Sequence, residues 1–175
     1  SIYIVRDPRT VIQSISHHYT LSKDDALEFM LSSQMTGNKE SYDKKKFGIL
    51  NLIGKWNDHY RSWTIRKKNL LLLKYEDLIL KPDQELNNII SFLKNYVKFS
   101  VNENKIKNII NIKYFINLKK MENKNLFQEN AYDRNTGIKK NFFNLGPNNK
   151  WENILNNKIK KKIEISFNKE MREIG

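Results

Sequence analysis

An arginine and a serine eight positions apart lie near the beginning of the chain, where a strand is expected to turn into a helix. Ile2 to Val5 is a short apolar run that predicts a buried strand. Asp7-Pro8 predicts a helix start, because Asp is a good N-cap and Pro suits the first helical position. Arg6 therefore falls on the turn, and a planar, permanently charged guanidinium suits phosphate. Ser14, about two turns along the helix, can meet the same anion; an ion pair between Arg6 and a surface carboxylate is the alternative.

An aromatic residue follows the second predicted strand, Asn69 to Lys74, whose apolar run is expected to be covered on both faces of a parallel sheet. Ligands of open α/β sheets bind outside the carboxyl ends of the strands. Arg6 and Tyr75 are therefore expected at one site, with a phosphate-binding arginine beside a ring that could lie against a base. Glu76 and Asp77 are expected to cap a short helix rather than to act as a catalytic carboxylate pair.

The remaining elements are expected to be helices, joined by polar segments. Predicted helices cover residues 8–19, 24–35, 48–67, a stretch that begins at Pro82, one or two short helices in 101–118, and 156–173. Residues 36–46 are expected to be a loop, and 122–149 have the weakest structural signal. Two apolar strands joined by long helical crossovers predict a single α/β domain with a parallel sheet flanked by helices.

The basic composition leaves more than one class of partner open. The 175 residues carry a formal net charge of +13 and no cysteine, so disulfides and thiolate metal sites are excluded. Lysines far outnumber arginines, which suggests a solvated lysine surface. The runs 44–46 and 160–162 keep a nucleic-acid-binding module as an alternative, although no nucleic-acid motif is present. No run approaches the ~20 apolar residues of a membrane span.

Three histidines are the candidates for a general base. His17 and His18 lie on the first predicted helix, close to Ser14, and are expected to be ordinary helix residues. His59 is expected to form a hydrogen bond within the core. The sequence therefore assigns no catalytic histidine.

Four segments resemble the PAPS-dependent sulfotransferases, in particular their cytosolic and bacterial branch. Residues 5–14 are similar to the family's 3′-phosphate motif, and 56–63 followed by 75–77 resemble its Trp-x-x-His-x-x-x-Trp helix and Tyr-Glu-Asp strand end. Residues 114–118 resemble its Ser-Phe-x-x-Met/Leu segment, and 163–175 resemble its closing helix. These segments follow the family's order along nearly the whole chain.

The resemblance implies a nucleoside-kinase-like P-loop sulfotransferase fold over residues 1–175 and transfer of a sulfuryl group from PAPS to a hydroxyl or amine. It implies that Arg6 and Ser14 bind the 3′-phosphate, that Tyr75 and Phe115 flank the adenine, and that Gly146 is the glycine of the family's Arg-Lys-Gly segment. PAPS would be the co-substrate, with no metal. The partner would be a small-molecule or glycan acceptor, with no nucleic acid.

The chain also departs from the family pattern. The Lys-Ser-Gly-Thr-Thr loop and the usual catalytic His are expected upstream of Ser1. The chain is therefore expected to supply only the 3′-phosphate and adenine half of the site, to hold no catalytic residue, and to be inactive alone. Asn144-Leu145 replaces the Arg-Lys pair, and a family Thr falls on Lys113. The candidates for the missing charge are Lys139, Lys140 and Lys150. A non-catalytic sulfotransferase-like remnant is the alternative.

Overall fold

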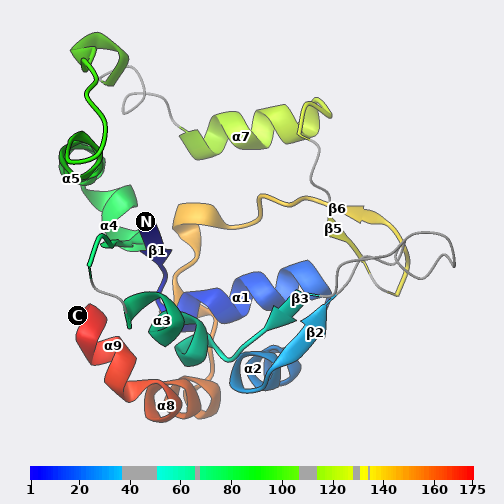
Figure 1. Cartoon of the computed structure of the whole chain (residues 1–175). Coiled ribbons are helices and arrows are strands. Elements are labelled where there is room, and N and C mark those ends of the chain that lie inside the picture. The colour runs from blue at the N-terminus through cyan, green and yellow to red at the C-terminus, as the bar shows by residue number, and fades with distance from the viewer. Residues whose placement is uncertain (37–50, 66–67, 107–113, 128–130, 134) are drawn as a thin grey trace, which may run out of the picture.

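Two parallel strands carry the predicted site. The structure is a computed structural model that describes residues 1–175 apart from 37–50, 66–67, 107–113, 128–130 and 134 (Figure 1). Strand β1 (Ile2–Val5) pairs in parallel with β4 (Leu71–Lys74), and Val5 lies opposite Lys74. The predicted parallel pairing is confirmed, and the residues after the two strands leave the same edge together.

The two strands differ from expectation in length and burial. Asn69 has φ 63°, a left-handed conformation that cannot belong to an extended strand, so β4 begins two residues later than predicted. In β1, Tyr3 and Val5 are buried, whereas Ile2 and Ile4 are 38% and 52% exposed. The prediction of a buried strand is therefore wrong for one face of β1: alternate side chains point to opposite faces, and among the described residues only one face is buried.

Helix α1 (Pro8–Tyr19) begins at the predicted residue. Helix α2 (Lys23–Leu31) begins one residue before the predicted start. Asp7 accepts a hydrogen bond from the backbone N–H of Arg9 at 2.8 Å, and Ser22 caps α2 in the same way through Asp25 at 3.1 Å. These two helices pack with α8 (Asn157–Ser166) around a core of buried apolar side chains. Its members are Ile12, Ala26, Leu27, Met30, Ile159, Ile163 and Phe167.

A short antiparallel pair replaces parts of two predicted helices. Strand β2 (Gln34–Thr36) pairs with β3 (Asn51–Ile53), so the prediction of helix through Met35 and again from Gly48 is wrong there. Ser32, the C-cap of α2, is already extended, and its hydroxyl donates to the carbonyl of Glu28 at 2.6 Å. The strands stabilise each other across a long separation in sequence, which local periodicity does not reveal. The predicted loop 36–46 lies outside the described residues from position 37 on.

Helix α3 (Trp56–Thr64) packs its aromatic side against β1. Trp56 stacks on Tyr60 with ring centroids 6.0 Å apart, and Trp63 stacks on Tyr3 at 5.7 Å. The Tyr3 hydroxyl is hydrogen-bonded to Nδ1 of His59 at 3.0 Å. The hydrogen bond predicted for His59 is thus present, although its ring lies at the exposed border of this aromatic group rather than inside a core. The helix predicted over 48–67 is therefore present from Trp56 to Thr64.

Helices α4 (Tyr75–Leu80) and α5 (Pro82–Lys94) follow β4 directly. Glu76 and Asp77 lie in the first turn of α4, where carboxylates favour the positive end of the helix dipole. The predicted capping role is wrong: the N-cap is Lys74, which has no side-chain capping bond, and Glu76 accepts from the backbone N–H of Asp7 instead. No apolar residue of α5 is fully buried in the part of the chain that the structure describes. Its half-buried Leu86 and Ile89 instead line a cavity.

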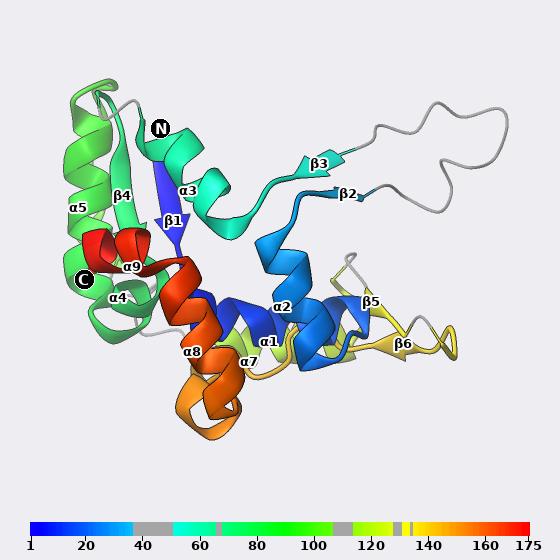
Figure 2. The same cartoon turned by 90° about the horizontal axis from the view of Figure 1, so that it is seen from below.

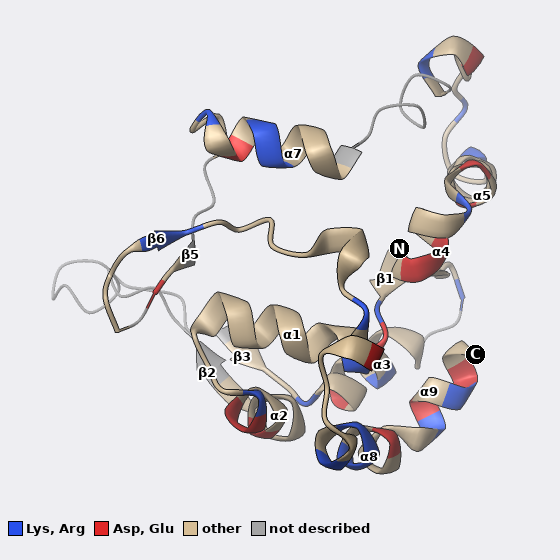
Figure 3. Cartoon of the chain, turned by 180° about the vertical axis from the view of Figure 1, so that it is seen from behind, with Lys and Arg blue, Asp and Glu red and all other residues tan. Residues whose placement is uncertain are grey.

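The segment with the weakest sequence signal contains several short elements. Helix α7 (Tyr114–Asn123) precedes the antiparallel pair β5 (Ala131–Tyr132) and β6 (Lys139–Lys140) and the 3-10 turns η2 (Gly146–Asn148) and η3 (Trp151–Asn153). In Figure 1, the chain after β6 runs between α7 and α1, and the reverse view in Figure 3 agrees. The short helices predicted in 101–118 fall partly on residues that the structure does not describe.

The C-terminal helix predicted at 156–173 is two helices, α8 and α9 (Asn168–Ile174). They meet at Phe167, whose φ of −119° and ψ of 20° interrupt the helix. Phe167 is buried against the ring of Trp56, with centroids 5.1 Å apart. In Figure 2, α8 lies beside α2, with which it shares a core, while α9 turns away toward the parallel strands. The break lets one amphipathic sequence cover two surfaces.

Candidate functional site

A cavity of about 1240 Å³ opens between α1, α4, α5, α7 and the segment after β6. All five predicted site residues line it: Arg6, Ser14, Tyr75, Phe115 and Gly146. They come from elements far apart in sequence. The walls from α4, α5 and α7 are mainly apolar, while α1 contributes polar side chains. Such a combination of apolar walls and a few convergent polar groups is typical of a small-molecule site.

The guanidinium of Arg6 lies between α1 and α4. Its Cζ lies 4.4 Å from the centroid of the Tyr75 ring, and Nη1 lies 3.4 Å from Oγ of Ser14. Nε is buried and has no hydrogen-bond partner among the described residues. The register of β1 and β4 brings residues 6 and 75 together, and the long arginine stem reaches Ser14 along α1. This arrangement holds a permanent positive charge at the cavity wall beside a hydroxyl donor.

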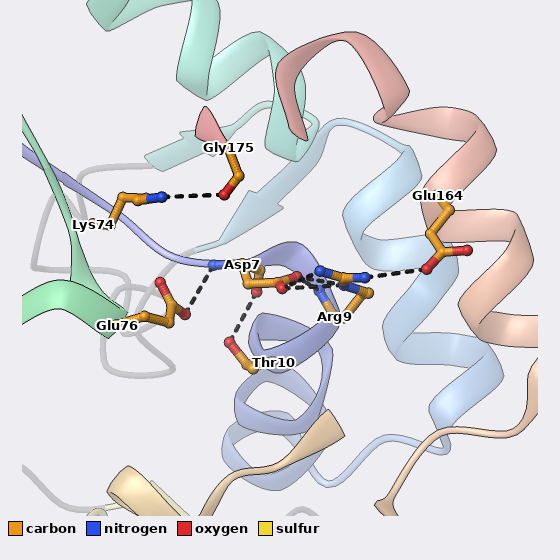
Figure 4. Close-up of polar contacts among 7 residues, drawn as sticks. All are labelled: Asp7, Arg9, Thr10, Lys74, Glu76, Glu164 and Gly175. Carbon is orange, nitrogen blue, oxygen red and sulfur yellow. Dashed lines mark hydrogen bonds and ion pairs between the residues drawn. The ribbon is translucent and has the colours of Figure 1, made fainter. Parts of the chain in front are cut away.

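Neighbouring polar contacts fix the turn that carries Arg6, as Figure 4 shows. The carboxylate of Asp7 accepts from Nη2 of Arg9 at 2.7 Å, and Nη1 of Arg9 reaches Glu164 on α8 at 3.1 Å. The backbone N–H of Asp7 donates to Glu76 on α4 at 3.2 Å. The hydroxyl of Thr10 donates back to the carbonyl of Asp7 at 2.9 Å. The turn is thus tied to both α4 and α8, so the position of Arg6 is set by the fold.

Phe115 and Gly146 meet on the α7 side of the cavity. Gly146 has φ 53°, and a Cβ added there would lie 2.6 Å from Cδ2 of Phe115 and closer still to two other ring atoms. Phe115 also meets Phe143 edge-on, with centroids 6.2 Å apart. The absence of a side chain at 146 therefore determines how closely the backbone approaches the aromatic ring.

Comparison with known families identifies the chain. The family model described as Sulfotransferase domain matches residues 1–175. The chain belongs to the sulfotransferase family. Its parallel sheet flanked by helices is the mixed α/β architecture expected for that domain. A search of curated proteins finds no match to the chain.

Within this sulfotransferase domain, the lysines proposed to replace the family's Arg-Lys pair have other contacts. Nζ of Lys139 donates to Asn125 at 3.0 Å, and Nζ of Lys140 donates to Thr20 at 2.8 Å and lies 3.9 Å from Asp133. Neither they nor Lys150 line the cavity. Among the described residues that do, Arg6 alone carries a permanent positive charge.

Two contacts that hold the wall of the sulfotransferase cavity had no recognisable signal in the sequence. Glu122 of α7 is 3% exposed, and its carboxylate accepts from the backbone N–H groups of Phe142 and Phe143. Nε2 of His17 lies 2.7 Å from the carbonyl of Asn141, to which it donates a hydrogen bond. In the sequence, Glu122 and His17 look like surface residues of helices. Their partners are backbone groups far away in the chain, which leave no pattern in the sequence.

The structure describes one of the two lysine runs on which the nucleic-acid alternative is based. Residues 44–46 lie outside the described residues. Figure 3 shows basic and acidic residues together on α8. Nζ of Lys160 lies 4.9 Å from the Trp151 ring centroid, and Nζ of Lys162 lies 2.7 Å from Glu28. Nucleic-acid binding stays an untested alternative.

The described ranges contain neither a cluster of metal ligands nor a membrane-spanning helix. No group of three or more His, Asp or Glu side chains there could hold a metal ion. None of the helices in that part of the chain has the length and apolar character needed to cross a bilayer.

Proposed function

We propose that this sulfotransferase transfers the sulfuryl group of PAPS to a hydroxyl or amine, and that the chain binds the 3′-phosphate and adenine end of the donor. In this reaction the bond between sulfur and the bridging phosphate oxygen breaks, and a bond from sulfur to the acceptor oxygen or nitrogen forms. The acceptor's proton passes to a base, and adenosine 3′,5′-bisphosphate leaves. Positioning and electrostatic stabilisation supply most of the catalysis in such transfers.

The observation that carries the proposal is the position of Arg6. Its guanidinium lies over Tyr75, with Nη1 3.4 Å from the Ser14 hydroxyl, at the wall of a large cavity. A 3.4 Å separation is long for a hydrogen bond, so a phosphate oxygen could accept stronger bonds from both groups. In the proposal, Arg6 and Ser14 bind the 3′-phosphate, the group that distinguishes PAPS from a 5′-nucleotide.

The aromatic residues of the same cavity support the adenine assignment. Tyr75 and Phe115 are contributed by α4 and α7, and both line the space into which Arg6 faces. Purine rings stack favourably on aromatic side chains. One face of Tyr75 is already covered by the guanidinium, so we assign its remaining surface to the adenine. Gly146 would bring its backbone N–H close to the ligand. The proposal assigns no general base and no ligand of the sulfate group to this chain.

Thermal denaturation with two nucleotides tests the assignment. At 100 times its Kd, adenosine 3′,5′-bisphosphate would stabilise the fold by about 2.7 kcal/mol, which corresponds to roughly 5–10 °C in Tm. AMP at the same concentration should give little shift. Arg6→Ala should abolish the shift, whereas Arg172→Ala, which removes an exposed arginine on α9, should retain it. Equal protection by AMP would show that the 3′-phosphate is not recognised.

A further inference from the structure

The segment that carries Gly146 is held between α1 and α7, and we call residues 141–149 the roof segment. On the α1 side, Nε2 of His17 donates to the carbonyl of Asn141 at 2.7 Å. At the other end, Nδ2 of Asn149 donates to the carbonyl of Thr10 at 2.9 Å, and this contact is buried. Both ends of the roof segment are therefore attached to the helix that carries Ser14.

A single buried carboxylate attaches the roof segment to α7. Oε1 of Glu122 accepts from the backbone N–H of Phe142, and Oε2 accepts from that of Phe143 at 3.2 Å. A carboxylate has two acceptor oxygens and no donor, so it matches two successive N–H donors. Hydrogen bonds to a charged group are stronger than those between neutral groups. Since Glu122 is 3% exposed, little water competes with its carboxylate for these two backbone donors.

The ring contacts that follow from this attachment reach the predicted adenine site. Phe142 and Phe143 pack on Phe127, with centroids 5.4 Å and 4.7 Å apart. Phe143 also contacts Phe115, against which Gly146 is packed. Glu122 and Phe115 both belong to α7, so the carboxylate sets the distance between that helix and the roof segment.

We propose that Glu122 is a positioning residue that holds the roof segment where Gly146 and Phe115 can contact the nucleotide. This inference rests on the proposed function, because its consequence for affinity requires the nucleotide to occupy this cavity. Glu122 itself does not line the cavity. It acts through the backbone of residues 142–143.

The direction in which Glu122→Gln changes the affinity for adenosine 3′,5′-bisphosphate distinguishes a positioning role from an electrostatic one. Glu122 contributes a negative charge near a site that is proposed to bind an anion. If the charge were its main influence, Glu122→Gln would bind adenosine 3′,5′-bisphosphate more tightly. If positioning dominates, the same isosteric change weakens binding, because a carboxamide has one acceptor oxygen and turns an N–H group toward the second backbone donor.

The experiment measures two quantities on Glu122→Gln and Glu122→Ala. Calorimetry gives the Kd for adenosine 3′,5′-bisphosphate, and amide hydrogen exchange reports Phe142 and Phe143 directly. We expect the Kd to rise about tenfold and exchange at these amides to accelerate about tenfold or more, from the loss of charge-assisted hydrogen bonds. Glu28→Gln, which removes an exposed partner of Lys162, is the control and should change neither quantity.

Each outcome decides the inference. Tighter or unchanged binding by a folded Glu122→Gln would overturn it, as would unchanged exchange at the two amides. If Glu122→Ala does not fold, the isosteric variant decides. If the unmodified chain does not bind the bisphosphate at all, the proposed function is wrong. Amide exchange at Phe142 and Phe143 then still tests whether Glu122 holds the roof segment.

Discussion

Gly146 packs against the ring of Phe115 so closely that a Cβ at 146 would lie 2.6 Å from Cδ2 of that ring. Its φ of 53° adds a second restriction, because this region is unfavourable for L side chains. We expect Gly146→Ala to lower the free energy of unfolding by about 2–4 kcal/mol through strain and displacement of Phe115. Urea unfolding measures this loss, and bisphosphate binding should weaken in parallel.

Gly137 supplies the matched control for that substitution. It has φ 70°, but no described residue beyond its chain neighbours lies within 4 Å of the Cβ that Gly137→Ala would add. This variant carries the backbone penalty alone, about 1–2 kcal/mol. Equal losses from the two variants would show that the contact with Phe115 contributes nothing.

Arg61 of α3 pairs with a buried carboxylate on α9. Nε of Arg61 donates to Oε1 of Glu170 at 2.6 Å, and Glu170 is 2% exposed. Arg61→Ala leaves that carboxylate buried without this partner, so we expect a loss of about 1–3 kcal/mol in the free energy of unfolding. Chemical denaturation monitored by tryptophan fluorescence measures it.

The exposed ion pair of Lys162 and Glu28 shows the cost of removing the basic partner when the carboxylate is not buried. Nζ of Lys162 lies 2.7 Å from Glu28, and the two side chains are 50% and 65% exposed. Lys162→Ala should lower the free energy of unfolding by at most about 1 kcal/mol, and this loss should disappear at high salt. If Arg61→Ala costs no more than Lys162→Ala, burial of Glu170 does not strengthen its dependence on the arginine.

Tyr3 makes stability depend on pH at the alkaline end. Burial and, to a smaller extent, the nearby Tyr60 together raise the pKa of its hydroxyl from 10.0 to about 12. Because the folded state holds the proton more tightly than the unfolded state, the stabilisation is fully present below pH 10. It falls between pH 10 and 12, by up to about 2–3 kcal/mol.

Tyr3→Phe isolates that contribution from other groups that titrate in the same range. The variant keeps the ring that stacks on Trp63 but removes the ionisable hydroxyl and its hydrogen bond to His59. Urea unfolding at pH 8 to 11.5 should therefore give a flatter stability profile for the variant than for the parent chain. Parallel profiles would contradict the assignment of this pH dependence to Tyr3.

Local sequence signals predicted the elements that depend on neighbouring residues. Asp7 and Ser22 mark helix starts because a capping side chain bonds to backbone groups two or three positions away. The parallel pairing of the two apolar strands was likewise predictable, and with it the meeting of Arg6 and Tyr75. The resemblance added Phe115 and Gly146, which line the same cavity.

Two of the wrong helix predictions have a common physical origin in long-range contacts. Residues 34–36 pair with 51–53, so their state depends on a partner strand rather than on helical periodicity. Phe167 interrupts the last helix where it packs against Trp56, although the apolar period continues through it. Each difference is a tertiary contact that overrides a local preference.

By itself, the sequence determined that a strand ends at an arginine, that a capped helix with a serine follows, and that a second strand ends at a tyrosine. These features depend on backbone geometry and nearest neighbours, which the order of residues specifies directly. Only the tertiary structure decided that Glu122 holds the roof segment and that Gly146 packs beneath Phe115. Those contacts join backbone groups to side chains far away in the chain, and backbone groups have no identity in the sequence.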